Sequence, residues 1–196
     1  MQRGRIVILD GPPRSGKSSL AAAIQQHVAG AWINLGVDLY NAALPKALLP
    51  GIGLRPGGER PDLEPMVLRL YQTLFDTIAL HAHAGFNVVA DLGIHDFYAT
   101  PLNIAVHLEQ KLAGLSVLMV GVTCADEINI ARRTKSEKSA TQYAVDPAIV
   151  ARWREAVAAG KRYDLVIDTG TTTPETGAMQ IDQALAAKTG TLDYEA

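Results

Sequence analysis

The segment LDGPPRSGKSS, residues 9–19, follows an apolar run and stands where a helical pattern should begin. It fulfils the spacing G-x-x-x-x-G-K-[ST], which cradles phosphate groups when it joins a buried strand to a helix. The residues that do so are Gly11, Pro12, Pro13, Arg14, Ser15, Gly16, Lys17 and Ser18. Glycine lets the backbone curl closely, so that N–H groups and the positive helix end converge on an anion. The segment therefore predicts a phosphate-binding loop.

Two polar residues of this loop have specific expected roles. Lys17 would reach the β- and γ-phosphates of a nucleoside triphosphate, and the Ser18 hydroxyl would bind Mg²⁺. We expect the nucleotide to contact residues 11–18 and the adjacent Ser19. The alternative is a structural turn that binds no phosphate. The strand-loop-helix setting favours the phosphate loop.

Five short apolar runs alternate with longer helical patterns along the chain. They are residues 5–9, 31–35, 87–92, 116–122 and 163–168. The runs are continuously apolar, which is typical of parallel strands that helices cover on both faces. The alternation predicts an α/β fold with a five-stranded parallel sheet between two layers of helices.

Helical patterns and their end signals fill the gaps between these runs. We expect one helix over residues 18–28, a second over 39–48, and a long third helix after Asp62 that ends at Gly85. Three further helices should begin where a capping residue precedes a proline. These pairs are Thr100-Pro101, Asp146-Pro147 and Thr173-Pro174.

The composition limits the classes of protein to which this chain can belong. The chain has 196 residues, 48% of them hydrophobic, which fits one domain over residues 1–196 with a buried core. The formal net charge of -2, with dispersed Lys and Arg, predicts neither nucleic acid nor a membrane surface as partner. The single cysteine, Cys124, and the lack of a signal peptide or a long apolar span lead us to expect a reduced, cytoplasmic protein.

Two aspartates stand where parallel strands end. Asp38 follows the second apolar run, where it could accept the proton of an acceptor hydroxyl or merely cap a helix. Asp91 lies near the end of the third run and could hold Mg²⁺ opposite Ser18, or serve only in a turn. Asp96 is a weaker candidate for the acceptor pocket.

A basic cluster opens a polar segment that we interpret as a lid over residues 131–146. Arg132 and Arg133 could clamp phosphates as the lid closes and stabilise transition-state charge, although a solvated helix end is the alternative. The segment after the fifth strand, residues 168–175, should pass near a bound purine. A Gly- and Pro-rich loop over residues 49–62 should help to wall the acceptor pocket.

Several of these segments together resemble the chloramphenicol phosphotransferase family. They are GPPRSGKSS (residues 11–19), AWINLGVD (31–38), VLMVGVTC (117–124) and YDLVIDT (163–169). The resemblance covers residues 6–187 and implies an adenylate-kinase-like fold of the P-loop NTPase class, with Asp38 as the catalytic base. Trp153 and Ala158 stand where the family would have Gln and His, so the resemblance is stronger for the nucleotide half than for the acceptor half.

We therefore expect ATP- and Mg²⁺-dependent phosphorylation of a hydroxyl on a small molecule, with Lys17, Asp38, Arg132 and Arg133 as catalytic candidates. The apolar candidates for the acceptor pocket are Leu39, Tyr40, Met66 and Leu70. A metabolite or nucleotide kinase on the same scaffold is the first alternative. A nucleotide-binding regulatory module without catalysis is the second.

Overall fold

The computed structural model describes residues 2–49, 60–135 and 146–190. Its sheet has five parallel strands in the order β2-β3-β1-β4-β5. The strands are β1 (Ile6–Asp10), β2 (Trp32–Asn34), β3 (Asn87–Leu92), β4 (Val117–Thr123) and β5 (Leu165–Asp168). Each strand overlaps one predicted apolar run, so the predicted parallel α/β fold is confirmed.

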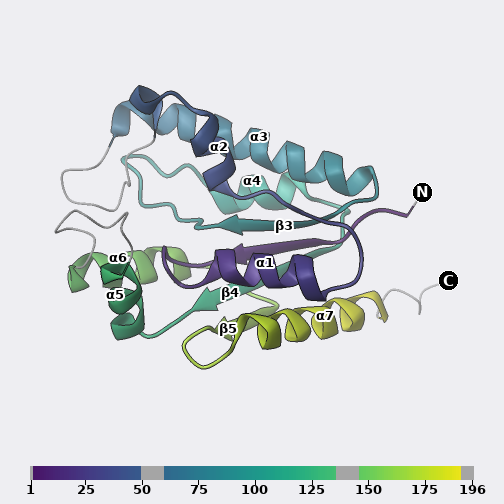
Figure 1. Cartoon of the computed structure of the whole chain (residues 1–196). Coiled ribbons are helices and arrows are strands. Elements are labelled where there is room, and N and C mark those ends of the chain that lie inside the picture. Colours follow the sequence, from purple (N-terminus) through teal and green to yellow (C-terminus); the bar gives the residue numbers. More distant parts are fainter. Residues whose placement is uncertain (1, 50–59, 136–145, 191–196) are drawn as a thin grey trace.

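Helices cover both faces of the sheet (Figure 1). The α-helices of the described residues are α1 (Lys17–His27), α2 (Val37–Ala43), α3 (Glu64–His83), α4 (Ile104–Lys111), α5 (Asp126–Thr134), α6 (Pro147–Ala158) and α7 (Pro174–Gly190). Val7 and Leu9 of β1 pack in the core with α1 and α7, whereas Ile6 and Ile8 pack with α3 and α4. Because β1 has no solvent face, every one of its residues is buried.

Several predicted helix ends are confirmed. The Asp146 carboxylate accepts the N–H of Ala148 at 2.8 Å and so caps α6. Thr173 Oγ1 accepts the N–H of Thr176 at 3.2 Å at the start of α7. The long helix α3 ends just before Gly85, which has a left-handed φ of 91°.

The predicted helix start at residues 100–101 is wrong. Helix α4 begins at Ile104, after Asn103 with a φ of 53°. The Asp96 carboxylate accepts the N–H groups of Leu102 at 2.7 Å and Asn103 at 2.8 Å. These bonds satisfy the backbone without a helical turn, so an irregular loop persists up to Asn103.

The predicted helix over residues 39–48 is shorter than expected. Helix α2 ends at Ala43, and a 3₁₀ turn follows over Lys46–Leu48, because Pro45 cannot continue an α-helix. Of the predicted lid, residues 131–134 form the end of α5, whereas residues 136–145 lie outside the described residues. Most of the predicted Gly- and Pro-rich loop, residues 50–59, also lies outside them.

Candidate functional site

The loop between β1 and α1 is built by close backbone contacts. A Cβ added to Gly11 would lie 2.1 Å from the carbonyl oxygen of Val122, so only glycine fits against β4. Gly16 has a φ of 99° and leads directly into α1, which begins without a side-chain cap. An uncapped helix start directs its first N–H groups toward the space in front of the loop.

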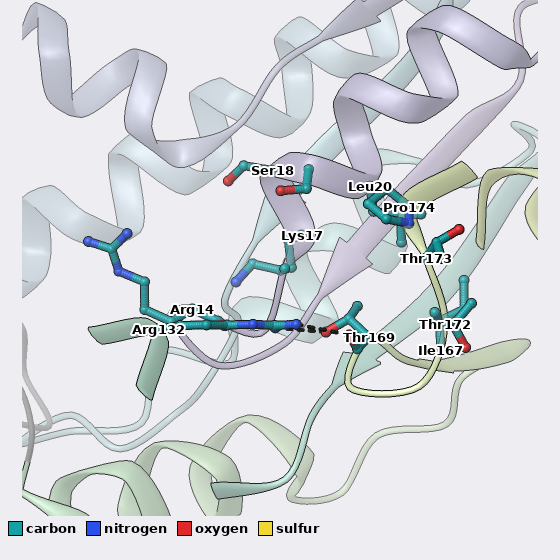
Figure 2. Close-up of a pocket in the computed structure, with 12 residues that line it drawn as sticks. Arg14, Lys17, Ser18, Leu20, Arg132, Ile167, Thr169, Thr172, Thr173 and Pro174 are labelled. Carbon is teal, nitrogen blue, oxygen red and sulfur yellow. Dashed lines mark hydrogen bonds between the residues drawn. The ribbon is translucent and has the colours of Figure 1, made fainter. Parts of the chain in front are cut away.

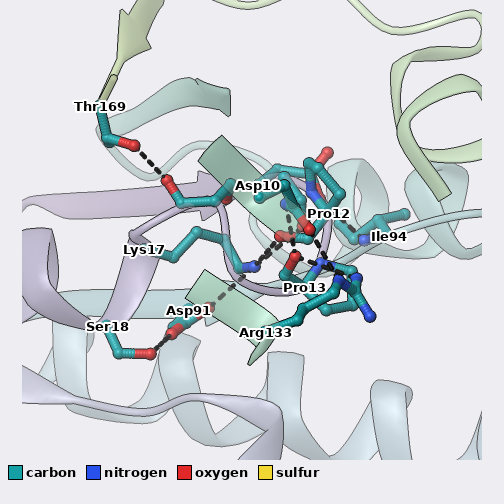
Figure 3. Close-up of polar contacts among 12 residues, drawn as sticks. Asp10, Pro12, Pro13, Lys17, Ser18, Asp91, Ile94, Arg133 and Thr169 are labelled. Atoms are coloured by element: carbon teal, nitrogen blue, oxygen red, sulfur yellow. Dashed lines mark hydrogen bonds and ion pairs between the residues drawn. The ribbon is translucent and has the colours of Figure 1, made fainter. Parts of the chain in front are cut away.

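Lys17, Ser18 and Asp91 meet at the start of α1 (Figure 3). Ser18 donates a hydrogen bond of 2.6 Å to Asp91 Oδ2, and Lys17 Nζ lies 3.7 Å from Asp91 Oδ1. Lys17 Nζ also donates to the carbonyl oxygens of Gly11 at 2.9 Å and Pro12 at 3.0 Å. Burial lowers the pKa of Lys17, and the negative charge of Asp91 opposes that shift.

Asp38 lies at the same edge of the sheet, in the first turn of α2. Its charge also acts to raise the pKa of Lys17, so the two groups are within electrostatic reach. Asp38 is exposed, and α2 is preceded by Gly36 with no side-chain cap. A Cβ on Gly36 would lie 3.0 Å from the carbonyl oxygen of Asp91, which brings the start of α2 against the end of β3.

A pocket of about 420 Å³ opens beside the loop (Figure 2). Its lining comes from the loop and α1, from α5, and from the end of β5 with the segment that follows. The lining residues are Arg14, Gly16, Lys17, Ser18, Ser19, Leu20, Arg132, Ile167, Thr169, Thr172, Thr173 and Pro174. The segment after β5, which the sequence predicts to pass near a purine, thus forms one wall of this pocket.

The structure gives the two predicted lid arginines different surroundings. Arg132 lines the pocket and donates to Thr169 Oγ1 at 2.9 Å and to the carbonyl oxygen of Thr169 at 2.8 Å. Arg133 is buried instead, and it donates to Asn129 Oδ1 at 2.7 Å and to the carbonyl oxygen of Pro13 at 3.3 Å. Arg133 therefore supports the back of the loop, and Arg132 faces the pocket.

The residues that the sequence predicts for the acceptor pocket do not line this pocket. The Asp96 carboxylate holds the loop before α4, and the Tyr40 hydroxyl lies 2.6 Å from Thr77 Oγ1. Leu39 is 55% exposed, and Met66 and Leu70 on α3 are half-buried. Asp96 also lines a smaller cavity of about 180 Å³ between the loop after β3, α4 and the end of α6.

His95 belongs to a buried aromatic cluster at this smaller cavity. Its ring stacks on Tyr98 with centroids 4.6 Å apart, and Trp153 of α6 meets it edge-on at 5.2 Å. His95 Nδ1 accepts the N–H of Phe97 at 3.2 Å, so the neutral ring carries its proton on Nε2. Burial, with a smaller contribution from the positive charge of Lys161, lowers the pKa of His95 to about 4.

Sequence reasoning missed a buried polar cluster beneath the loop. Asp10, the last residue of β1, is fully buried and accepts hydrogen bonds from Lys161 Nζ and, at 2.8 Å, from the Tyr163 hydroxyl. Both donors follow α6, more than 150 positions later in the chain. No local pattern signals this pairing, although an acidic residue inside an otherwise apolar strand is itself unusual.

Comparison with known proteins agrees with this geometry. A family model described as chloramphenicol phosphotransferase-like protein matches residues 4–186. The chain belongs to this family. Two relatives from Mycobacterium tuberculosis, strains CDC 1551 and H37Rv, are named for a proposed O-phosphotransferase activity. Each is 29% identical over an alignment of 143 residues, and the match covers 65% of this chain and 60% of the relative.

The fold of this family member is shared with P-loop kinases. The APS kinase of M. tuberculosis, solved in complex with AMPPNP and APS, has a TM-score of 0.66 at 17% identity, over 95% of this chain and 99% of that one. Shikimate kinase from Acinetobacter baumannii has a TM-score of 0.56 at 12% identity, over 95% of each chain. At these identities the likeness shows the fold alone.

Within the described residues, no helix could cross a membrane.

Proposed function

We propose that the chain is an ATP- and Mg²⁺-dependent O-phosphotransferase that moves the γ-phosphate of ATP to a hydroxyl group of a small molecule. The observation that carries this proposal is the Ser18–Asp91 pair beside Lys17 at the start of α1. This pair brings a hydroxyl and a carboxylate close to an ammonium group where the phosphate loop opens. Family membership supports the same reaction class.

The residues of the site fit Mg²⁺ and ATP. Mg²⁺ prefers oxygen ligands and usually keeps several waters, so one hydroxyl and one carboxylate suffice as protein ligands. Ser18 and Asp91 would hold it, and the bound ion would neutralise charge on the β- and γ-phosphates. The pocket of about 420 Å³ lies beside the loop, where Arg132 and the segment after β5 would contact the nucleoside.

The chain's own groups then account for the transfer. An oxygen of the acceptor attacks the γ-phosphorus as the bond to the β–γ bridging oxygen breaks, and ADP leaves. Asp38 would accept the proton of the acceptor hydroxyl, a role that typically contributes about 10²- to 10⁴-fold to the rate. Lys17 would exchange its bonds to the Gly11 and Pro12 carbonyl oxygens for bonds to phosphate, and Arg132 would stabilise the nucleotide from the opposite side.

Surroundings support Asp38 as the base. Among residues 2–49, 60–135 and 146–190, its carboxylate has no hydrogen-bond or ion-pair partner, unlike Asp91 and Asp10. An unpaired, exposed carboxylate within electrostatic reach of Lys17 can approach an incoming hydroxyl without first breaking a salt bridge. The acceptor should therefore enter between α2 and the phosphate loop.

The test is acceptor-stimulated ADP release in the presence of Mg²⁺. A panel of hydroxylated antibiotics, sugars and nucleosides, with chloramphenicol included, is compared with the same panel on Lys17→Ala. The proposal predicts that at least one acceptor raises ADP release well above the basal rate and that Lys17→Ala removes this increase. Binding of ATP that no acceptor converts to ADP would instead favour a regulatory nucleotide-binding module.

A further inference from the structure

The buried cluster beneath the loop holds a complete ion pair. Asp10 is fully buried and Lys161 has only 9% of its side chain exposed. The Asp10 carboxylate accepts three hydrogen bonds, from Lys161 Nζ, from the Tyr163 hydroxyl at 2.8 Å, and from the N–H of Ile94 at 2.8 Å. A carboxylate that only accepts hydrogen bonds is ionised, so its charge has to be balanced inside the protein.

The ion pair of Asp10 and Lys161 connects β1 to the chain that follows β3, beyond the ends of both strands. The last register pair is Asp10 with Leu92, because β1 then turns into the phosphate loop. Two residues further on, Ile94 donates its N–H to the Asp10 carboxylate at 2.8 Å (Figure 3). The carbonyl oxygen of Ile94 accepts a hydrogen bond of 2.5 Å from Lys161 Nζ. The N–H and the carbonyl oxygen of Ile94 are therefore both hydrogen-bonded to side chains of this ion pair.

Asp10 also lies close to the groups that face the nucleotide. It directly precedes Gly11, and its negative charge acts on Lys17 along with that of Asp91. If Asp10 had no cationic partner, a buried negative charge would stand beneath the loop and oppose the phosphate groups above it. Lys161, which comes from the connection between α6 and β5, supplies the compensating charge.

We infer that Lys161 is a positioning residue for the nucleotide, because it neutralises Asp10 and fixes Ile94, and so allows the phosphate loop to bind a polyphosphate. This inference rests on the proposed function, since it requires that the loop binds a nucleoside triphosphate. It adds that a residue outside the loop, in the connection between α6 and β5, contributes to the affinity for the nucleotide. The effect should grow with the number of phosphate groups.

The substitution that separates charge from hydrogen bonding is Lys161→Gln, which keeps a donor for the Ile94 carbonyl oxygen. Binding of ATP, ADP and AMP is measured by calorimetry with Mg²⁺ for this variant, for Asp10→Asn and for the double variant. We expect Lys161→Gln to weaken ATP binding about tenfold, ADP binding less and AMP binding least. The double variant, in which no unpaired charge remains, should return to within about threefold of the unmodified chain.

The matched control is Lys111→Gln, which removes the same charge from an exposed ion pair with Asp76. It should leave all three affinities unchanged. Equal weakening of ATP, ADP and AMP, or a double variant no better than Lys161→Gln, would mean a purely structural role and overturn the inference.

Two further results distinguish the inference from the function on which it rests. If the unmodified chain binds ATP and Lys161→Gln binds it equally well, only the inference fails. If the unmodified chain binds no ATP, the proposed function fails and the inference fails with it. Should Lys161→Gln not fold, Asp10→Asn decides alone: ATP binding at least as tight as that of the unmodified chain supports the inference, and clearly weaker binding refutes it.

Discussion

Ser18 donates a 2.6 Å hydrogen bond to Asp91, although 73 positions separate the two residues in the chain. The sheet order explains this contact, because β1 and β3 are neighbours and Asp91 pairs in register with Leu9. The phosphate loop begins two residues after Leu9 and returns at Ser18 to the end of β3. A hydroxyl and a carboxylate are thereby brought together at one edge of the sheet.

Asp91→Asn should make activity depend on more magnesium. The amide retains the size of the side chain but lacks the negative charge that attracts the ion, so we expect the Mg²⁺ concentration for half-maximal turnover to rise about tenfold. Titration of turnover with MgCl₂ at saturating ATP measures this. Asp182→Asn, at an exposed position of α7, is the control and should not shift the curve. An unchanged requirement in Asp91→Asn would exclude Asp91 as a metal ligand.

Asp38→Asn should abolish turnover while ATP still binds. Loss of a general base lowers the rate of transfer about 100-fold or more, whereas an exposed residue of α2 contributes little to holding the nucleotide. Initial rates and calorimetric titration of ATP together separate the two effects. Turnover within about threefold of the unmodified chain would show that Asp38 is not the base.

The variants Arg132→Ala and Arg133→Met should have different effects, one on ATP binding and the other on stability. Arg132 lines the pocket, so its loss should weaken ATP binding with little change in thermal stability. Arg133 is 5% exposed and bonds to Asn129 and to the Pro13 carbonyl oxygen, so its loss should lower the free energy of unfolding by about 2 kcal/mol. Denaturant unfolding and ATP titration of both variants check this. If both variants lost affinity and stability to the same extent, the separate roles would be contradicted.

Acidification should destabilise the protein through His95. Its pKa falls from 6.5 in the unfolded chain to about 4 in the fold, so protons bind more readily to the unfolded state. The stabilising contribution is fully present above pH 6.5 and is lost as the pH falls through 4, with a limiting value of roughly 3 kcal/mol. Unfolding free energies between pH 7.5 and pH 4 measure it.

His95→Phe, which keeps a ring between Tyr98 and Trp153, should show a flatter dependence of stability on pH. His83→Gln changes an exposed histidine and should keep the slope of the unmodified chain. The same slope in His95→Phe as in the unmodified chain would assign the pH dependence to other groups.

The parts of the fold that the sequence predicts are those whose signals are local. The strands are recognisable because both faces are buried and the apolar runs are unbroken, as in β1. The phosphate loop is recognisable because its motif is contained within residues 11–18, although the contact that requires glycine at position 11 comes from Val122 on β4. Asp146 caps α6 as expected, since an N-cap needs only its own helix.

Long-range side-chain contacts account for what the sequence does not predict. The Asp96 carboxylate overrides the local helix signal at residues 100–101 by binding two backbone N–H groups further along. Asp10 and Lys161 are 151 positions apart, and neither lies in a pattern that indicates its partner. Arg132 and Arg133 have different surroundings because of the way α5 is turned about its own axis. The spacing of residues in the sequence does not determine that orientation.

Calorimetric titration of the unmodified chain with ATP in the presence and absence of Mg²⁺, beside Lys17→Ala and Ser18→Ala, tests the central claim most directly. The account predicts binding of ATP at one site, stronger with Mg²⁺, with Lys17→Ala losing most of the affinity and Ser18→Ala losing the magnesium effect. The absence of binding heat for any nucleoside triphosphate, or equal binding by the unmodified chain and Lys17→Ala, would contradict it.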